Sequence, residues 1–413
     1  MTARADPLVA PDPVLSAALT DGLRGRRTIL LLMALTALGQ LGVNLALPAL
    51  PSIGTALGIT SADTALILST YLVGLAAGQL VVGPLSDRFG RRSVLLWGLA
   101  LFTVAGALSA FALDEASLLG LRVVQGAGAS APLAIGRAVA RDLYDGTPLV
   151  RVMALMTMAM AVVPGLAPAL GGVLTEILGW RGALGSAGIA GLGLLLLVTM
   201  RLPETNRTPL THLDGADVAR LYSTLVVSRV FLGHALANTM VLAALYAFFA
   251  GAPRVLIGPA ALTPAQFGLV PVATSLAYIA GGWALLRTTD GTRLRAATLL
   301  AARFATIAGS AGLIALFLSG PVTLLGTVIG SATYAFGLGA LLPVGVAGAL
   351  VPFREEAGTA SALLSALQMA GGALAGAAVG WIGGAPSLAY PAVMLGCVLA
   401  SLIVAITLVP KDR

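Results

Sequence analysis

The densest group of chemistry-bearing residues in this 413-residue chain is the stretch GPLSDRFGRRS, from Gly83 to Ser93. It combines one aspartate, three arginines and two glycines, and long apolar runs flank it on both sides. A carboxylate can pair with a guanidinium group or with the positive N-terminal end of a neighbouring helix. Gly83 and Gly90 permit a tight turn and close backbone approach. We therefore predict a charged turn between two apolar helices, with ion pairs that form and break.

Enzymatic chemistry is not indicated. A nucleophile with its base, or a metal site, needs several reactive side chains close together. The chain has two histidines, His212 and His234, and one cysteine, Cys397, which are scattered along the sequence. We predict no catalytic residue, no metal site and no cofactor.

Polar and ionisable side chains inside apolar segments are costly and often functional. Arg122 either snorkels to the nearer membrane surface or takes part in conformational or proton coupling. His234 either carries a proton or simply binds a neighbour. Arg137 is expected to be an anchor near a helix end. A polar and aromatic lining suits a cavity for amphiphilic molecules, although these side chains can instead join helices; the candidates are Gln40, Asn44, His234, Asn238, Tyr246 and Gln368.

Composition places the chain in a membrane. Hydrophobic residues make up 58% and charged residues 10%, and the mean hydropathy is +0.97. A soluble domain carries roughly 25% charged residues. The formal net charge is +7, but the arginines are dispersed between apolar blocks. Nucleic acid requires a basic stripe on one face, so it is excluded as a partner.

The apolar runs predict an all-α fold. A helix needs about 20 apolar residues to cross the hydrocarbon core. Twelve runs qualify, at 28–50, 63–85, 93–112, 117–141, 150–178, 182–201, 228–250, 265–287, 294–318, 321–345, 357–382 and 386–409. With the N-terminus inside, the outer loops hold two arginines, Arg181 and Arg254. By the positive-inside rule, both termini are expected in the cytoplasm.

Two halves of six spans are predicted. The polar stretch 202–227 separates a first bundle, 28–201, from a second, 228–409, and tails at 1–27 and 410–413 complete the chain. Loop features recur at an offset near 200 residues, and Gly90 has a counterpart in Gly291. Parallel six-span repeats indicate a transporter with its substrate site between the halves.

GPLSDRFGRR, between the second and third of twelve spans, resembles the loop motif of the major facilitator superfamily. LRVVQGAGAS is similar to the family's fourth-span element, and VVPGLAPALGGVL is similar to its fifth-span antiporter motif, with Ala167 in place of the first glycine. The segments LALPALPSIGTALG, STYLVGLAAGQLVVGPLSDRFGRR and AGTASALLSALQMAGGALAGA together resemble the Bcr/CflA drug-resistance branch.

This resemblance implies two pseudo-symmetric six-helix bundles in the bacterial inner membrane and export of small amphiphilic compounds by alternating access, with the proton gradient as energy source. Uptake or facilitated diffusion of a metabolite is the alternative, and a membrane-embedded enzyme is a remote one. The resemblance assigns a cytoplasmic gate to Gly83, Asp87, Arg88, Gly90, Arg91 and Arg92. It assigns coupling or conformational roles to Arg122, Gln125, Gly126, Pro168, Gly171 and Gly172.

One departure bears on the substrate. The branch commonly has an aspartate where this chain has Asn44, and no carboxylate lies near a predicted midplane. An unpaired cation in low dielectric is costly, so we expect neutral or anionic substrates. A transported proton would ride on His234, on Asp63 or Glu176 at a span end, or on the substrate. We expect the protein to act as a monomer.

Overall fold

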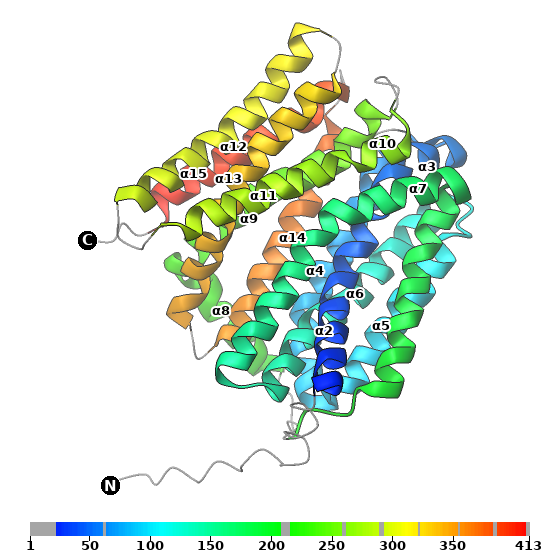
Figure 1. Cartoon of the computed structure of the whole chain (residues 1–413), viewed down its shortest axis with the longest axis vertical. Helices are drawn as coiled ribbons and strands as arrows, with labels where there is room; N and C mark the ends of the chain where they lie inside the picture. The colour runs from blue at the N-terminus through cyan, green and yellow to red at the C-terminus, as the bar shows by residue number, and fades with distance from the viewer. Residues whose placement is uncertain are drawn as a thin grey trace.

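The computed structural model is a bundle of long helices, and the residues it describes contain no β-strand (Figure 1). It describes residues 22–60, 63–207, 215–257, 262–288, 293–320, 323–353, 356–382 and 386–409. Most of the predicted N-terminal tail, the tail at 410–413, His212 and Gly291 lie outside these residues. The prediction of an all-α membrane fold is confirmed.

The first half contains six spans. Its buried centre is formed by α4 and α6, which carry Tyr71 and Arg122. Its elements are α2 (Gly22–Asn44), η1 (Leu47–Ala49), α3 (Leu50–Leu57), α4 (Thr64–Phe89), α5 (Arg91–Ser109), α6 (Glu115–Leu143) and α7 (Gly146–Arg201).

The helix α7 holds two spans in one continuous element. Gly179 interrupts it with φ 67° and ψ 179°, a conformation that other residues rarely adopt. The break falls in the gap between the predicted spans 150–178 and 182–201. Eleven helical stretches of the described residues are long and apolar enough to cross a membrane, and the break in α7 makes twelve spans.

The second half repeats this plan. Its α10 begins at Pro264, about 200 residues after the start of α4, as the sequence offset predicts. Its elements are α9 (Arg229–Leu256), α10 (Pro264–Gly268), α11 (Val270–Leu286), α12 (Arg293–Ser319), α13 (Leu324–Leu350), η2 (Val351–Phe353), α14 (Ala357–Trp381) and α15 (Pro386–Thr407).

The stretch between the halves is partly helical, which the sequence analysis did not predict. Helix α8 (Gly215–Val227) lies in the predicted linker 202–227 and packs on α9 and α14. Tyr222 donates from its hydroxyl to the Leu80 carbonyl, at 2.9 Å, and so ties this helix to the first half. Burial raises the pKa of Tyr222 above its ordinary value, which keeps the phenol a neutral donor.

The largest contacts between the two halves involve two spans of each half, and the repeat relates these contacts to each other. Helix α4 packs on α14, and α7 packs on α10 and α11, which together form one span (Figure 1). The α7 contact lies far from the turn between α4 and α5. We call the end of the molecule that carries this turn the α4–α5 end, and the other the opposite end.

Candidate functional site

The charged stretch Gly83–Ser93, which we keep calling the charged turn, holds a chain of ion pairs where α4 meets α5. Gly90 alone lies between the two helices, and Gly83, predicted to permit a tight turn, lies inside α4 instead. Arg91 forms an ion pair with Asp87 on one side, and its Nε lies 3.2 Å from Oδ2 of Asp142 on α6. Its guanidinium also donates to the Ser86 hydroxyl, at 2.7 Å. All these partners belong to the first half. In this conformation the ion pairs of the turn therefore hold α4, α5 and α6 together.

A second carboxylate holds the start of α5. The backbone N–H groups of Arg91 and Arg92 donate to the Glu204 carboxylate, at 2.8 and 3.1 Å. Helix N-terminal N–H groups lack partners within the helix and favour an anion. Gly90 has φ 89°, and a Cβ there would lie 2.9 Å from Cδ of Glu204. The backbone conformation favours glycine at position 90, and a side chain there would also displace the Glu204 carboxylate.

The remaining residues of the predicted gate lie nearby with different contacts. Arg92 donates to the Thr199 carbonyl, at 3.0 Å, and the exposed Arg88 guanidinium lies 5.0 Å from the Phe89 ring centre. Gly83 borders a cavity and leaves open space where a Cβ would be. The role of these residues as a gate stays a prediction.

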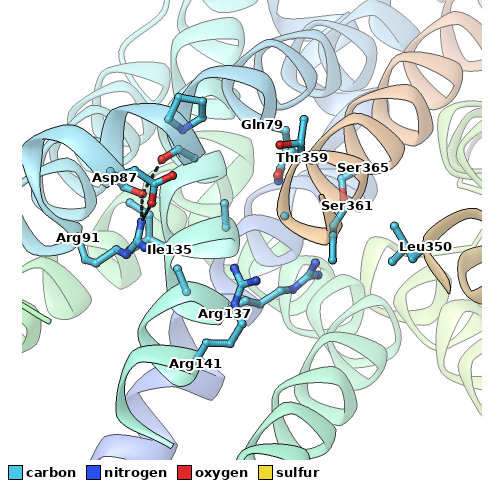
Figure 2. Close-up of a pocket in the computed structure, with 18 of the residues that line it drawn as sticks. Gln79, Asp87, Arg91, Ile135, Arg137, Arg141, Leu350, Thr359, Ser361 and Ser365 are labelled. Carbon is cyan, nitrogen blue, oxygen red and sulfur yellow. Dashed lines mark hydrogen bonds and ion pairs between the residues drawn. The ribbon is translucent and has the colours of Figure 1, made fainter. Parts of the chain in front are cut away.

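A cavity of about 370 Å³ separates the halves at the α4–α5 end (Figure 2). Its walls come from α4, α5, α6 and α7 of the first half, from α8 of the linker, and from α13 and α14 of the second half. The Asp87 side chain is 43% exposed, and both Asp87 and the first turn of α14, Ala357 to Thr359, line this cavity. Glu356 precedes α14 without a side-chain cap hydrogen bond, so the N-terminus of α14 has N–H groups to offer an acceptor.

Arg122 is 1% exposed and lies deep in the first half, so it does not snorkel to a membrane surface. It donates to the carbonyls of Gly42, at 3.1 Å, and Ile67, at 3.3 Å, and to Oε1 of Gln125, at 2.7 Å. Its guanidinium carbon lies 4.5 Å from the Tyr71 ring centre. Among the described residues no carboxylate pairs with it.

The position of this arginine has a local cause. Gly42 lies in the last turn of α2, where carbonyl groups lack helical partners and favour a cation. Gly126, one turn after Arg122, lets α6 approach the α4 backbone, because a Cβ there would lie 2.9 Å from the Leu75 nitrogen. Arg122, Gln125 and Gly126 thus form one contact between α2, α4 and α6. Their role in coupling stays a prediction.

The α7 motif lies where the halves touch, at the opposite end. A Cβ on Gly172 would lie 2.7 Å from Cα of Ala265, and one on Gly171 would lie 3.0 Å from Cα of Leu45. A Cβ on Gly268 of α10 would in turn lie 2.6 Å from Cα of Ala169. Small residues therefore permit backbone contact between α7 and the second half.

Glu176 reinforces this contact from the first half. Its carboxylate accepts from the Ala265 backbone N–H, at 3.0 Å, and so binds the N-terminus of α10. The halves are thus closed at the opposite end, while the cavity separates them at the α4–α5 end.

The six residues predicted to line a substrate cavity lie away from the cavity of Figure 2. Tyr246 donates from its hydroxyl to Sδ of Met369, at 3.6 Å. Gln368 donates to Asn238, at 2.5 Å, and Asn238 donates to the Leu342 carbonyl, at 2.8 Å. These contacts lie within the second half, and Gln40 of the first half is buried.

The other two predicted cavity residues have different surroundings. Asn44 is fully buried and donates to the Gln40 carbonyl, at 2.7 Å, while its Oδ1 has no hydrogen-bond partner. His234 packs against Gly348 of α13 within the second half. Whether the six residues contact substrate stays a prediction.

Several residues of this site escaped the sequence analysis. Glu204 and Asp142 complete the charged turn, although they lie 113 and 51 residues from Arg91. Gln79 and Arg141 line the cavity, and so does Arg137, which was expected to be a helix-end anchor. A signal for Arg137 and Arg141 was present, because residues four apart share one face of a helix.

Comparison with known proteins agrees with this arrangement. The family model described as Major Facilitator Superfamily matches residues 32–347. An uncharacterized MFS-type transporter of Bacillus subtilis, YdgK, is 31% identical over 85% of this chain and 87% of its own length. Multidrug resistance protein D of Escherichia coli is 28% identical over 84% of this chain and 87% of its own length.

A shorter match and two solved structures complete the comparison. A chloramphenicol resistance protein of Pseudomonas aeruginosa is 33% identical over 61% of this chain and 59% of its own length. A bacterial homologue of the lysosomal transporter Spinster, inward-facing and occupied, has a TM-score of 0.70 at 16% identity, covering 92% of this chain and 95% of that one. The partially occluded inward-open xylose transporter XylE of E. coli has a TM-score of 0.69 at 15% identity, covering 93% and 97%. These structures share the fold.

Proposed function

The chain belongs to the major facilitator superfamily of membrane transporters, and from this premise we propose that it exports small amphiphilic compounds from the bacterial cytoplasm by alternating access. One observation carries the proposal: the halves touch at one end and enclose a cavity at the other. In alternating access, the closed end opens when the open end closes. Such a molecule can therefore bind substrate on one side of the membrane and release it on the other. The named functions of the multidrug and chloramphenicol resistance relatives support export.

We place the α4–α5 end and both termini in the cytoplasm. The arginines of the charged turn gather at this end, as the positive-inside rule requires. In this orientation the structure faces inward, and the contact between α7 and α10 closes the outer side.

Export is tested in everted membrane vesicles. Cells producing the protein should accumulate less chloramphenicol than cells with an empty vector, and everted vesicles should take the drug up. Uptake into right-side-out vesicles, with none into everted ones, would instead support the alternative of metabolite import.

Energy coupling is proposed to come from the proton gradient, without a cofactor. The carriers we propose are His234, Asp63, Glu176 or the substrate itself, because no carboxylate lies near the midplane. Export of neutral or anionic compounds should then exceed export of a quaternary cation, tetraphenylphosphonium, and should respond to an imposed pH gradient. Gradient-driven export of the cation that persists in His234→Ala would contradict both the preferred substrate class and His234 as carrier.

Asp87→Asn is expected to slow export about ten-fold while leaving the amount of protein in the membrane unchanged. When the cavity closes, the Asp87 carboxylate is proposed to meet the N–H groups of the first turn of α14. A hydrogen bond to a charged group contributes about 1.5–3 kcal/mol, and 1.4 kcal/mol corresponds to ten-fold. The measurement is the initial rate in everted vesicles.

Asp145→Asn is the matched control for this substitution. Asp145 is exposed at the same end and makes no side-chain cap hydrogen bond to α7. Its variant should export like the wild type. An Asp87→Asn rate equal to that of the control would show that the carboxylate is not part of a gate.

A further inference from the structure

Two arginines of α6 face the cavity without a carboxylate partner among the described residues. Arg137 and Arg141 lie one helical turn apart, and Figure 2 shows both directed into the space between α6 and α14. The Arg137 guanidinium donates to Sδ of Met160, at 3.4 Å, and a thioether sulfur is a weak acceptor. Arg91 lines the same cavity, but Asp87 and Asp142 neutralise it. The four charged residues that line the cavity, Asp87, Arg91, Arg137 and Arg141, sum to a net charge of +2, and Asp142 beside Arg91 lowers this sum to +1.

A buried amide in the same cavity also lacks an acceptor. Gln79 of α4 is 3% exposed, and its Nε2 has no hydrogen-bond partner in the structure. A buried donor left without a partner costs about 1–3 kcal/mol. Such a group is expected to find its acceptor in water or in a bound molecule.

The wall opposite these residues adds further donors. Ser361 and Ser365 on the first turns of α14 line the cavity, as does Thr359 (Figure 2). The N-terminus of α14 carries the positive end of its helix dipole. Arginine, amide and backbone N–H groups all donate hydrogen bonds, so the cavity is matched to a molecule that accepts them and carries negative charge.

The positive-inside rule accounts for Arg141, which is exposed in the last turn of α6, but it does not explain the placement of Arg137. That rule needs arginines near the membrane surface, and the exposed Arg151 of α7 satisfies it without facing the cavity. Arg137 instead lies one turn deeper, half-buried, on the face of α6 that borders the space between the halves.

We propose that this cavity binds the anionic group, a carboxylate or sulfonate, of an amphiphilic substrate through Arg137, Arg141 and the amide of Gln79. Ile135 and Leu350, which also line the cavity, would contact the apolar body. The volume of about 370 Å³ lies within the range of small-molecule sites. This inference rests on the proposed function and names the substrate class that enters from the α4–α5 end.

A matched pair of compounds tests the site by binding alone. Naphthalene-2-sulfonate and naphthalene-2-sulfonamide share one ring system and differ in charge. We expect isothermal titration of wild-type protein in lipid nanodiscs to show saturable binding of the sulfonate, at least ten-fold tighter than that of the sulfonamide. Arg137→Gln and Arg141→Gln should each weaken sulfonate binding about ten-fold, the effect of one charge-assisted hydrogen bond, and change sulfonamide binding less than two-fold.

Two further variants sharpen this test. Gln79→Glu keeps the shape of the side chain but adds a negative charge, and should weaken sulfonate binding at least as much as either arginine variant. Arg151→Gln removes an arginine outside the cavity and should bind the sulfonate like the wild type. Equal loss in Arg151→Gln, equal affinity for the two compounds, or no saturable binding of the sulfonate would overturn the site.

Transport of the same pair separates this inference from the proposed function. One outcome is that sulfonate binding needs Arg137 and Arg141 but the vesicles show no export. This outcome would support the anion site and contradict the proposed export function. Export of neutral drugs with no specific sulfonate binding would retain the exporter and contradict the anion site.

Discussion

Replacing Arg122 by methionine is expected to abolish transport and to lower the free energy of unfolding by about 2–4 kcal/mol. The substitution keeps an apolar chain of similar length but removes the donors that bind Gly42, Ile67 and Gln125. Three buried acceptors would then lose the donor that Arg122 supplies, and α2, α4 and α6 would lose their common contact. Thermal unfolding followed by a thiol-reactive dye at Cys397, together with efflux, measures both effects.

Two further variants show whether the effect depends on the hydrogen bonds of Arg122. Arg122→Lys keeps the charge, but one ammonium group cannot satisfy three separated acceptors as a planar guanidinium does, so an intermediate loss is expected. Arg303→Met removes a half-buried arginine of α12 that forms no ion pair with the described residues, and should change stability by less than about 1 kcal/mol. An Arg122→Met protein as stable as this control would contradict the network described here.

Gly172→Val is expected to reduce transport at least ten-fold by keeping the halves apart at the opposite end. A Cβ at this position would lie 2.7 Å from Cα of Ala265, which is backbone and cannot move aside as a flexible side chain can. The contact of α7 with α10 at the opposite end would therefore be strained, and overpacking of this kind costs about 1–3 kcal/mol. Initial efflux rates in everted vesicles measure the effect.

Gly193→Val is the control on the same helix, because a Cβ there meets nothing within 4 Å. Its transport should equal that of the wild type. Glu176→Ala removes the carboxylate that binds the start of α10 and should weaken the same closure more mildly. Normal transport by Gly172→Val would mean that the closed contact is not needed in the cycle.

Much of the fold could be predicted from the sequence, because each span is set by local composition. Apolar runs and turn residues located the spans to within six residues; the largest differences are at α2, predicted at 28–50, and at the end of α9. Gly179 breaks α7 where two spans were expected. The helix α8 was missed, since its residues lie in the most polar stretch and its packing depends on α9 and α14.

The site was harder to predict because its contacts join residues far apart in the chain. The motif located Asp87 and Arg91, yet no local pattern connects them to Asp142 or to Glu204. The same holds for Gln79, whose missing acceptor becomes evident only when α4 and α14 enclose a cavity. The burial of Arg122 likewise depends on carbonyls that two other helices bring to it.

The most direct test of alternating access measures both ends of the molecule at once. Cys397 is the single cysteine, so Cys397→Ser gives a background for paired spin labels. One pair, Val150 at the start of α7 with Val351 after α13, lies at the α4–α5 end. The other pair, Phe111 after α5 with Leu318 near the end of α12, lies at the opposite end. All four side chains are exposed. Distances would be measured by double electron–electron resonance in lipid nanodiscs, with and without a transported compound.

Alternating access predicts a second population of molecules in which the Val150–Val351 distance shortens while the Phe111–Leu318 distance lengthens. Distances that stay fixed, or that change in the same direction at both ends, would contradict it.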